Sequence, residues 1–260
     1  MYVVEAVERC PICGGKGQFY DEEEERGDGN YMVRLDKCDD CGTYYQNPRL
    51  TEDALKEYHQ KGWYQLGYPR SEIGEQRRAD RLTLLLQRFK LHPKRCLDYG
   101  AAHGFLLKNL KNSFSADIVG LEYDPRFSVI DDMFINKEQI EGTFDLITCI
   151  HTLEHFRDPI EEMKWMVDRL DPNGTILLEL PLVLKITLPH IYTFNMASIQ
   201  LMLNNLGLHY LYLESSDMCD ILIGDKYSDF KVEKVYYNFD SPDFTTEKEF
   251  TQWFRNSLSS

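Results

Sequence analysis

The chain has 260 residues, 43% of them hydrophobic, which is enough for one full core and a small additional module. Its formal net charge of −14 disfavours nucleic acid or an anionic membrane as the main partner, because both are bound largely through an excess of Lys and Arg. The sequence has no run of 18 apolar residues and no hydrophobic region of a signal peptide, so we expect a cytoplasmic protein without a membrane span.

Four of the seven cysteines form two C-x-x-C-G motifs near the N-terminus, built from Cys10 and Cys13 and from Cys38 and Cys41. Four thiolates around one ion are the tetrahedral arrangement of structural Zn²⁺, which leaves no open position for catalysis. A redox pair and a chance spacing are the competing interpretations. We predict a zinc-ribbon module over residues 1–47, in which the acidic stretch 21–25, together with the Gly-Asp-Gly of residues 27–29, is the tip of a solvated hairpin.

Residues 48–92 are predicted to be a helical linker or lid between the ribbon and the main domain. Their aromatic stretch, residues 63–69, is interpreted either as a lid over a cofactor or as packing between the two parts. The apolar residues of a second helix, residues 75–91, lie on one face, and arginines such as Arg78 and Arg81 lie on the other. Such arginines more often face solvent than substrate, and we expect that here.

The main domain, residues 93–226, begins with a short apolar run that ends at Asp98 and turns on Gly100 and Gly104. Apolar residues at helical spacing follow the turn, and a second apolar run ends at Glu122. This pattern predicts a strand, a tight turn, a helix and a second strand. They would form the first half of a Rossmann-like α/β sheet, with the ligand at the carboxyl ends of the strands.

The turn spacing of Gly100, Ala102 and Gly104 does not match the G-x-G-x-x-G pattern of dinucleotide-binding proteins. It resembles D-x-G-x-G-x-G, motif I of the class I S-adenosylmethionine (SAM) methyltransferases, with Ala102 in place of the middle glycine. SAM has no phosphate, so the turn only has to let the methionyl part approach the backbone. Glu122 suits the ribose, because one carboxylate can accept hydrogen bonds from both hydroxyls. A plain strand-to-helix connection is the alternative.

Three further residues are expected to contact SAM. Asp98 ends the first strand and Tyr123 follows the second. The weakly patterned stretch 127–140 is expected to hold a short third strand, from which Asp131 or Asp132 would reach the adenine. We choose Asp132 as the candidate.

The remaining strands and helices follow from buried apolar runs. Residues 144–151 and 175–180 are predicted to be strands covered on both faces, with a helix at 159–170 between them. Residues 208–213 and 219–224 are predicted to form a closing hairpin. The result would be a seven-stranded sheet.

The closest family resemblance lies in four segments: Phe-Asp-Leu-Ile at 144–147, Leu-Glu-His-Phe-Arg-Asp-Pro at 153–159, Leu-Asp-Pro-Asn-Gly at 170–174 and Glu-Leu-Pro at 179–181. They resemble the small-molecule class I SAM methyltransferases. A zinc ribbon ahead of such a core is similar to sugar methyltransferases that act on nucleotide-linked deoxysugars and surface-polysaccharide precursors. The resemblance implies a small acceptor, such as a sugar nucleotide or phosphorylated precursor. The Asn-Pro-Pro-aromatic tetrad of amino-directed nucleic-acid methyltransferases is absent.

The segment from His151 to His155, with Glu154, also fits the H-x-x-E-H pattern of inverted zinc peptidases. A peptidase needs this pattern within one continuous helix, whereas here it directly follows a predicted buried strand. We therefore disfavour a peptidase. His151 lies at the strand end nearest to the expected methyl group, and Glu154 and His155 are expected to fix the turn.

His190 precedes a predicted helix at 196–206. In the zinc-containing sugar C-methyltransferases the corresponding loop resembles Glu-His-x-x-Tyr-Phe-Ser, and its His is the proposed general base. His190 matches that His, whereas Pro189 replaces the Glu. His190 and His151 are our candidates for the base, since a near-neutral pKa lets a histidine accept a proton. A histidine that only closes the pocket is the alternative for His190.

Two other functions compete with methyl transfer. One is a binding or scaffold module whose SAM pocket is regulatory, with the ribbon holding a partner. The other is an NAD-dependent sugar dehydrogenase or epimerase, which the missing third glycine disfavours. Residues 227–260 lie beyond the resemblance, and we expect them to cover a sheet edge or to join two subunits of a homodimer.

Overall fold

The structure is a computed structural model that describes residues 2–25, 31–61, 72–123, 128–131, 133–134, 136–215 and 218–225. Asp132, the aromatic stretch 63–69 and the C-terminal residues 227–260 lie outside the described residues. Within the described part, no helix combines the length and the apolarity needed to cross a membrane.

The main sheet has the strand order β12-β13-β10-β9-β6-β7-β8. Its strands are β6 (Arg95–Tyr99), β7 (Asp117–Leu121), β8 (Met133–Phe134), β9 (Phe144–Ile150), β10 (Leu170–Pro181), β12 (Leu208–Ser215) and β13 (Met218–Asp225). The five strands from β10 to β8 run parallel, which confirms the predicted α/β sheet in its central part, and the β12–β13 hairpin adds antiparallel strands. The chain order reverses between β6 and β9, and ligands of open α/β sheets bind at such switch points.

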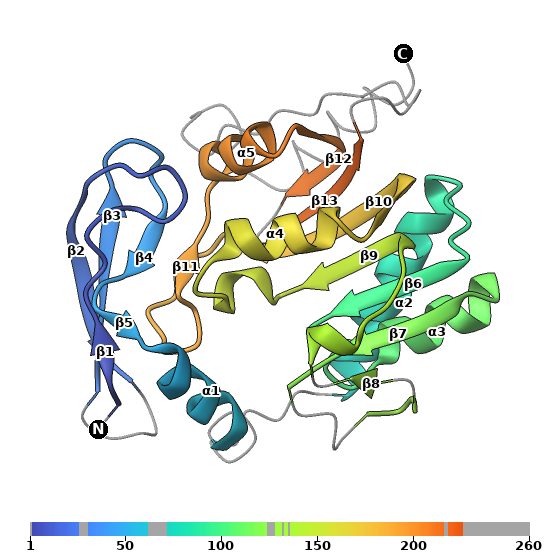
Figure 1. Ribbon diagram of the computed structural model, residues 1–260, viewed down its shortest axis with the longest axis horizontal. Helices are drawn as coiled ribbons and strands as arrows, with labels where there is room; N and C mark the ends of the chain where they lie inside the picture. The colour runs from blue at the N-terminus through green and yellow to red at the C-terminus, as the bar shows by residue number, and fades with distance from the viewer. Residues whose placement is uncertain are drawn as a thin grey trace.

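Helices cover both faces of this sheet (Figure 1). They are α2 (Glu72–Arg88), α3 (Phe105–Phe114), α4 (Pro159–Val167) and α5 (Met196–Asn205). Alternate strand residues belong to separate apolar clusters: Cys96 and Leu146 pack with α2 and α3, whereas Leu97 and Ile147 pack with α4 and α5. This alternation explains why the central strands read as continuous apolar runs.

The N-terminal module forms a second sheet, of order β11-β4-β3-β2. Its strands are β2 (Gly17–Glu24), β3 (Met32–Cys38), β4 (Tyr44–Gln46) and β11 (Tyr192–Thr193), beside which β1 (Val4–Glu5) pairs with β5 (Arg49–Leu50). The helix α1 (Glu52–Lys61) follows β5. Because β11 comes from the main domain, the two parts of the chain share one sheet.

The acidic stretch of the module lies in a hairpin and is mostly exposed, as predicted, but residues 21–24 belong to the strand β2, which pairs with β3, and Glu25 is buried. Residues 27–29 of the predicted tip lie outside the described residues. A carboxylate oxygen of Glu25 accepts a hydrogen bond from the backbone N–H of Leu188, at 2.5 Å. This partner lies far away in the sequence, so composition alone suggested solvent exposure.

A second side chain of the module holds the same loop. The amide nitrogen of Gln46 lies 3.0 Å from the carbonyl oxygen of Thr187, 2.9 Å from that of Leu188 and 3.0 Å from that of His190. The backbone N–H of Gln46 also donates to the Ile191 carbonyl. The ribbon therefore fixes the backbone of the loop that carries His190.

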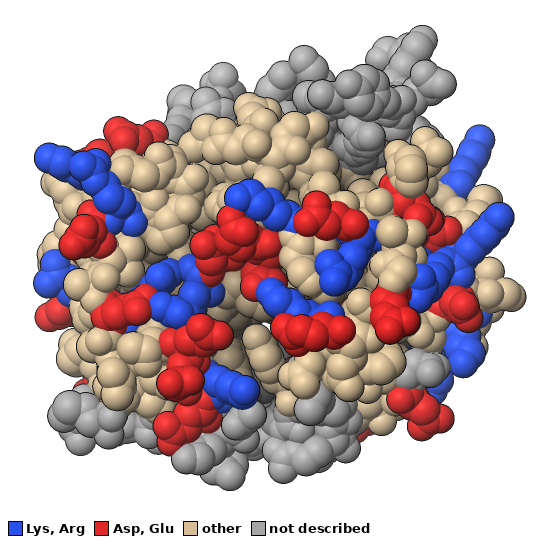
Figure 2. Space-filling model, in the orientation of Figure 1, with Lys and Arg blue, Asp and Glu red and all other residues tan. Residues whose placement is uncertain are grey.

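Figure 2 shows the charged side chains of one face. Lysines and arginines are interspersed with aspartates and glutamates, and neither sign forms a continuous track there.

The turn after β6 places three residues in the left-handed region: Gly100 at φ 81°, Ala102 at 51° and Gly104 at 79°. A Cβ at Gly100 would clash with Thr152, and one at Gly104 would lie 2.9 Å from Ile130 Cγ1. Both glycines are therefore required by space as well as by backbone conformation. Ala102 has the same kind of backbone conformation with a Cβ attached.

We expect Ala102→Gly to stabilise the protein by about 1 kcal/mol or less. A left-handed conformation costs an L-residue about 1–2 kcal/mol, part of which is offset by the greater freedom of glycine in the unfolded chain. Urea unfolding measures the change. The matched control is Ala101→Gly, because Ala101 is buried and has no positive φ, so its replacement should destabilise. An equal loss of unfolding free energy in both variants would contradict the assignment of strain to Ala102.

Candidate active site

Two adjoining cavities lie at the carboxyl ends of the parallel strands. The first, of about 380 Å³, lies between α2, the glycine turn and the loop before β11, and the second, of about 540 Å³, lies between α1, β7 and the start of α4. Gly100, His151 and His155 line both. The point where the two cavities meet is therefore the point where β6 and β9 end.

Asp98 lies at the end of β6 and lines the first cavity. Only 3% of it is exposed, and its carboxylate accepts a hydrogen bond from the Thr148 hydroxyl at 2.7 Å. Burial, together with the nearby carboxylates of Glu122 and Glu75, raises the pKa of Asp98 to about 7 despite this hydrogen bond. The side chain is thus poised between its neutral and charged forms near neutral pH.

Glu122 and Tyr123 line the second cavity, immediately after β7. A carboxylate oxygen of Glu122 accepts a hydrogen bond from the backbone N–H of Ala102 at 2.8 Å. The ring of Tyr123 stacks on that of His59 from α1, with centroids 6.0 Å apart. The structure thus brings both predicted residues beside the glycine turn.

Some cavity residues were missed by the sequence analysis. Asn136 and Lys137 line the second cavity just after β8. Glu75 of α2 lines the first cavity, and one of its carboxylate oxygens lies 2.7 Å from Nδ1 of His103. Glu75 lies one helical turn before Arg78, and residues at this spacing share a helix face. This spacing was the sequence signal that Glu75 and Arg78 could line the same cavity.

Arg78 and Arg81 bind the fully buried Glu179 at the end of β10, while 37% and 43% of their own side chains stay exposed, so the expectation that they face solvent holds only in part. The Arg78 Nε atom lies 2.9 Å from one carboxylate oxygen of Glu179, and Arg81 pairs with the other. Burying an uncompensated carboxylate is costly, so both arginines turn toward it. This ion pair holds α2 against the strand ends.

His151 ends β9 in a left-handed conformation, at φ 50°. Its Nε2 atom lies 3.0 Å from Glu179 Oε1, and its Nδ1 atom lies 3.5 Å from Glu154 Oε1. Burial opposes the charge of the imidazole, but the carboxylates of Glu154 and Glu179 outweigh this effect and raise the pKa of His151 to about 9.

Glu154, His155 and His190 meet beside His151. Nδ1 of His155 lies 2.6 Å from the carbonyl oxygen of Pro189, and its Nε2 lies 3.8 Å from Glu154 Oε1. The rings of His155 and His190 are 5.0 Å apart and nearly perpendicular. Burial lowers the pKa of His155 to about 3 and also lowers that of His190. The two predicted histidines, His151 and His190, therefore line one wall of the first cavity.

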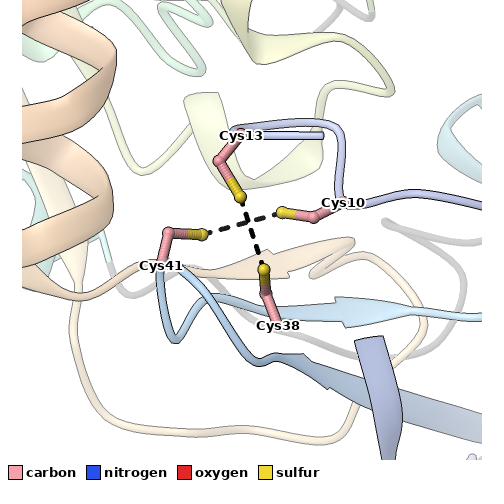
Figure 3. Close-up of side chains that lie close together, drawn as sticks. All are labelled: Cys10, Cys13, Cys38 and Cys41. Atoms are coloured by element: carbon pink, nitrogen blue, oxygen red, sulfur yellow. Dashed lines mark hydrogen bonds between the residues drawn. The ribbon is translucent and has the colours of Figure 1, made fainter. Parts of the chain in front are cut away.

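The four predicted metal ligands of the ribbon also converge. Figure 3 shows the sulfur atoms of Cys10, Cys13, Cys38 and Cys41 pointing at one centre, and all four lie within 4.8 Å of one another. Glycines with positive φ follow both motifs and let each loop turn. This cluster is compatible with a zinc site. None of the four cysteines lines either described cavity.

Comparison with known proteins assigns the main domain. A family model described as "Methyltransferase domain" matches residues 72–213, which is more than half of the chain. The structure of the plantazolicin methyltransferase BpumL in complex with SAH matches with a TM-score of 0.52 and 13% identity, over 66% of this chain and 95% of that one. The mitomycin 7-O-methyltransferase MmcR matches with a TM-score of 0.52 and 13% identity, over 66% of this chain and 60% of that one. At 13% sequence identity, these matches establish a similar fold and nothing about the substrate.

A curated relative, a tRNA U34 carboxymethyltransferase of Sulfurimonas denitrificans (strain ATCC 33889 / DSM 1251), is 28% identical over 113 residues. The match covers 37% of this chain and 38% of that protein, so the chain spans well under half the length of this relative. The family match, the five parallel strands and the strand-end cavities agree with the predicted methyltransferase fold. The chain therefore belongs to this methyltransferase domain family.

Proposed function

We propose that the protein is an SAM-dependent methyltransferase that acts on a small polar acceptor, a sugar or a related precursor of surface polysaccharide. The observation that carries this proposal is the meeting of two cavities at Gly100, His151 and His155. A donor bound along the glycine turn would present its methyl group where the strand ends meet. The first cavity, of about 380 Å³, then leaves room for a small acceptor.

The second cavity suits the adenosine part of SAM. The Glu122 carboxylate is beside the turn and can accept hydrogen bonds from two ribose hydroxyls. The Tyr123 ring offers an apolar face to a base, and the side chain of Asn136 offers an amide for its polar edge. The methionyl part would lie along Gly100 toward Asp98, whose carboxylate form suits the donor's ammonium group.

The first cavity suits an acceptor with several hydroxyl or anionic groups. Arg78, Lys185, His151 and His190 all line it, so hydrogen-bond donors are available on more than one side. The resemblance to sugar methyltransferases favours a sugar among such molecules. The tRNA named for the curated relative is disfavoured here, because the net charge is −14 and the face in Figure 2 mixes both signs.

Methyl transfer requires little chemistry from the protein, because the sulfonium already activates the methyl group. The chain must hold the acceptor's nucleophile in line behind that methyl, and such positioning is worth roughly 7–11 kcal/mol of barrier. In the proposed arrangement the turn holds the donor, and His151 and His190 contact the acceptor. That one of these histidines accepts the acceptor's proton stays a prediction.

We expect His190→Ala to retain SAM binding and to lower turnover on a sugar acceptor roughly 10²-fold or more, because an acceptor-side contact is lost. Calorimetry measures SAM binding, and release of S-adenosylhomocysteine from a panel of nucleotide sugars measures turnover. His92→Ala is the matched control, since His92 is exposed and lines neither cavity. Unchanged turnover in the His190 variant would show that this residue takes no part in the reaction. If the parent protein binds SAM but turns over no sugar, the proposal of a sugar acceptor is wrong.

We expect SAM affinity to rise with pH through the pKa of Asp98, which burial raises to about 7. Only the ionised carboxylate pairs with the ammonium group of SAM, so affinity is high above this pKa and is lost below it. The increase between about pH 6 and about pH 8 should be roughly tenfold. Calorimetric titration across this range measures it, with Asp98→Asn as the comparison. An equally steep rise in the Asp98→Asn variant would assign the effect to another group.

We also propose that the four cysteines bind one structural Zn²⁺. The convergence of four thiols at one centre, without an open position, supports this role. The site is linked to the active-site loop, because the side-chain amide of Asn195, which caps α5, donates to the carbonyl oxygen of Cys41 at 3.0 Å. Zinc would thus stabilise the ribbon that holds the His190 backbone through Gln46.

We expect the purified protein to contain one zinc per chain and Cys38→Ser to lose it. Structural zinc contributes roughly 10–16 kcal/mol of apparent binding energy in small fingers, so the variant should also melt at a markedly lower temperature. Atomic absorption and thermal denaturation measure the two effects. Cys96→Ala is the control, because Cys96 is buried in the main domain and should affect stability while zinc is retained. A full zinc complement in Cys38→Ser would exclude this site.

A further inference from the structure

We propose that Glu154, His155 and His190 form a binding site for a divalent cation in the active site, separate from the four cysteines. One ligand atom from each of these three residues lies within 4.8 Å of the others. His155 and His190 line the first cavity, so the site borders the space assigned to the acceptor. Two imidazoles and one carboxylate are a ligand set suited to Zn²⁺, Co²⁺ or Fe²⁺.

The carboxylate of Glu154 is the first argument. The side chain is fully buried, and neither of its oxygens has a hydrogen-bond partner among the described residues. Among the described residues, the nearest cationic group is that of His151, whose Nδ1 atom lies 3.5 Å from Oε1, beyond a normal hydrogen bond. A buried carboxylate without hydrogen bonds is costly, and a coordinated cation would satisfy both oxygens.

The orientation of His155 is the second argument. Its Nδ1 atom lies 2.6 Å from the Pro189 carbonyl oxygen, which can only accept, so Nδ1 carries the proton. The other nitrogen, Nε2, then directs its lone pair toward Glu154 Oε1, 3.8 Å away. Two electron-pair donors that face each other favour a cation between them. A ligating histidine usually donates its second nitrogen to a carbonyl or carboxylate in this way.

The fixed position of His190 is the third argument. Its Nδ1 atom is buried without a hydrogen-bond partner among the described residues. The backbone carbonyl of His190 is held by Gln46, so the imidazole is presented from an anchored loop. Its ring lies 5.0 Å from that of His155, nearly perpendicular to it. Both histidines therefore lie within reach of one cation beside Glu154.

The proposed site uses Glu154 and His155, the last two residues of the H-x-x-E-H pattern, and it does not imply a peptidase. His151 does not complete the ligand set, because its Nε2 atom faces Glu179 at 3.0 Å. Glu154 and His155 come from the short helix η3 (Leu153–His155), and the third ligand comes from the loop before β11. A continuous helix is therefore not needed to bring the ligands together.

The role of the cation rests on the proposed function. With only three protein ligands, the ion keeps open positions toward the first cavity, as catalytic metal sites do. An oxygen of the acceptor, from a hydroxyl or a carboxylate, would occupy one of them. The cation would then orient the acceptor next to the donor's methyl group, and His190 would act through the ion.

The test is a Co²⁺ titration of the zinc-loaded protein without SAM or acceptor, followed by metal analysis and visible absorption. We expect one additional Co²⁺ per chain, retained zinc, and cobalt bands without thiolate charge transfer, which separates this site from the cysteines. Glu154→Gln should weaken Co²⁺ binding at least tenfold, and His190→Gln should do the same if the first variant does not fold. Glu161→Gln, an exposed residue of α4, is the matched control and should bind like the parent.

Two results would overturn the site: no Co²⁺ bound at millimolar concentration, or Co²⁺ binding that is unchanged in both the Glu154 and the His190 variants. Neither result depends on SAM or on a sugar. The titration can therefore fail while methyl transfer is observed, and it can succeed while the sugar acceptor is wrong.

Discussion

The buried carboxylate of Glu179 is the interaction on which the active site depends. It lies at the end of β10 and binds Arg78 and Arg81 of α2 as well as His151 at the end of β9. Three elements that are distant in the chain are thereby locked around one negative charge. Because the carboxylate is fully buried, its charge has to be compensated by these partners, and each of them contributes to that balance. It closes the first cavity on the side of α2.

The N-terminal module supports a loop that borders that cavity. Gln46 holds three carbonyl oxygens of the loop that carries His190, and Glu25 binds the N–H of Leu188 in the same loop. Backbone groups of a loop are normally satisfied by water, so a buried loop needs such partners. The ribbon supplies them, and β11 of the main domain completes its sheet. None of the described residues of the module lines the cavity, so its contribution to the site is to hold the loop that carries His190.

The meeting of Asp98, Gly100 and Glu122 at one edge of the sheet was predictable from the sequence because its signals are local. These residues are set by the strand–turn–helix pattern, and the rule that parallel strands end at one edge then brings them together. Glu179 and Gln46 carry no such signal. Each is a polar residue at the end of an apolar strand, and its role depends on partners far away in the sequence. The strain at Ala102 was also invisible, since a sequence shows the missing glycine but not the backbone conformation.

The same distinction explains the different chemistry of the two sides. In the proposed arrangement, the donor would be held by main-chain groups and strand-end carboxylates that lie at short sequence separation. The acceptor side would be assembled from the ends of β9 and β10, from η3 and from a loop that the ribbon holds in place. The positions of these segments depend on the contacts of Glu179 and Gln46. Acceptor specificity would then depend on long-range contacts, and the ribbon would contribute to it by fixing the backbone of His190.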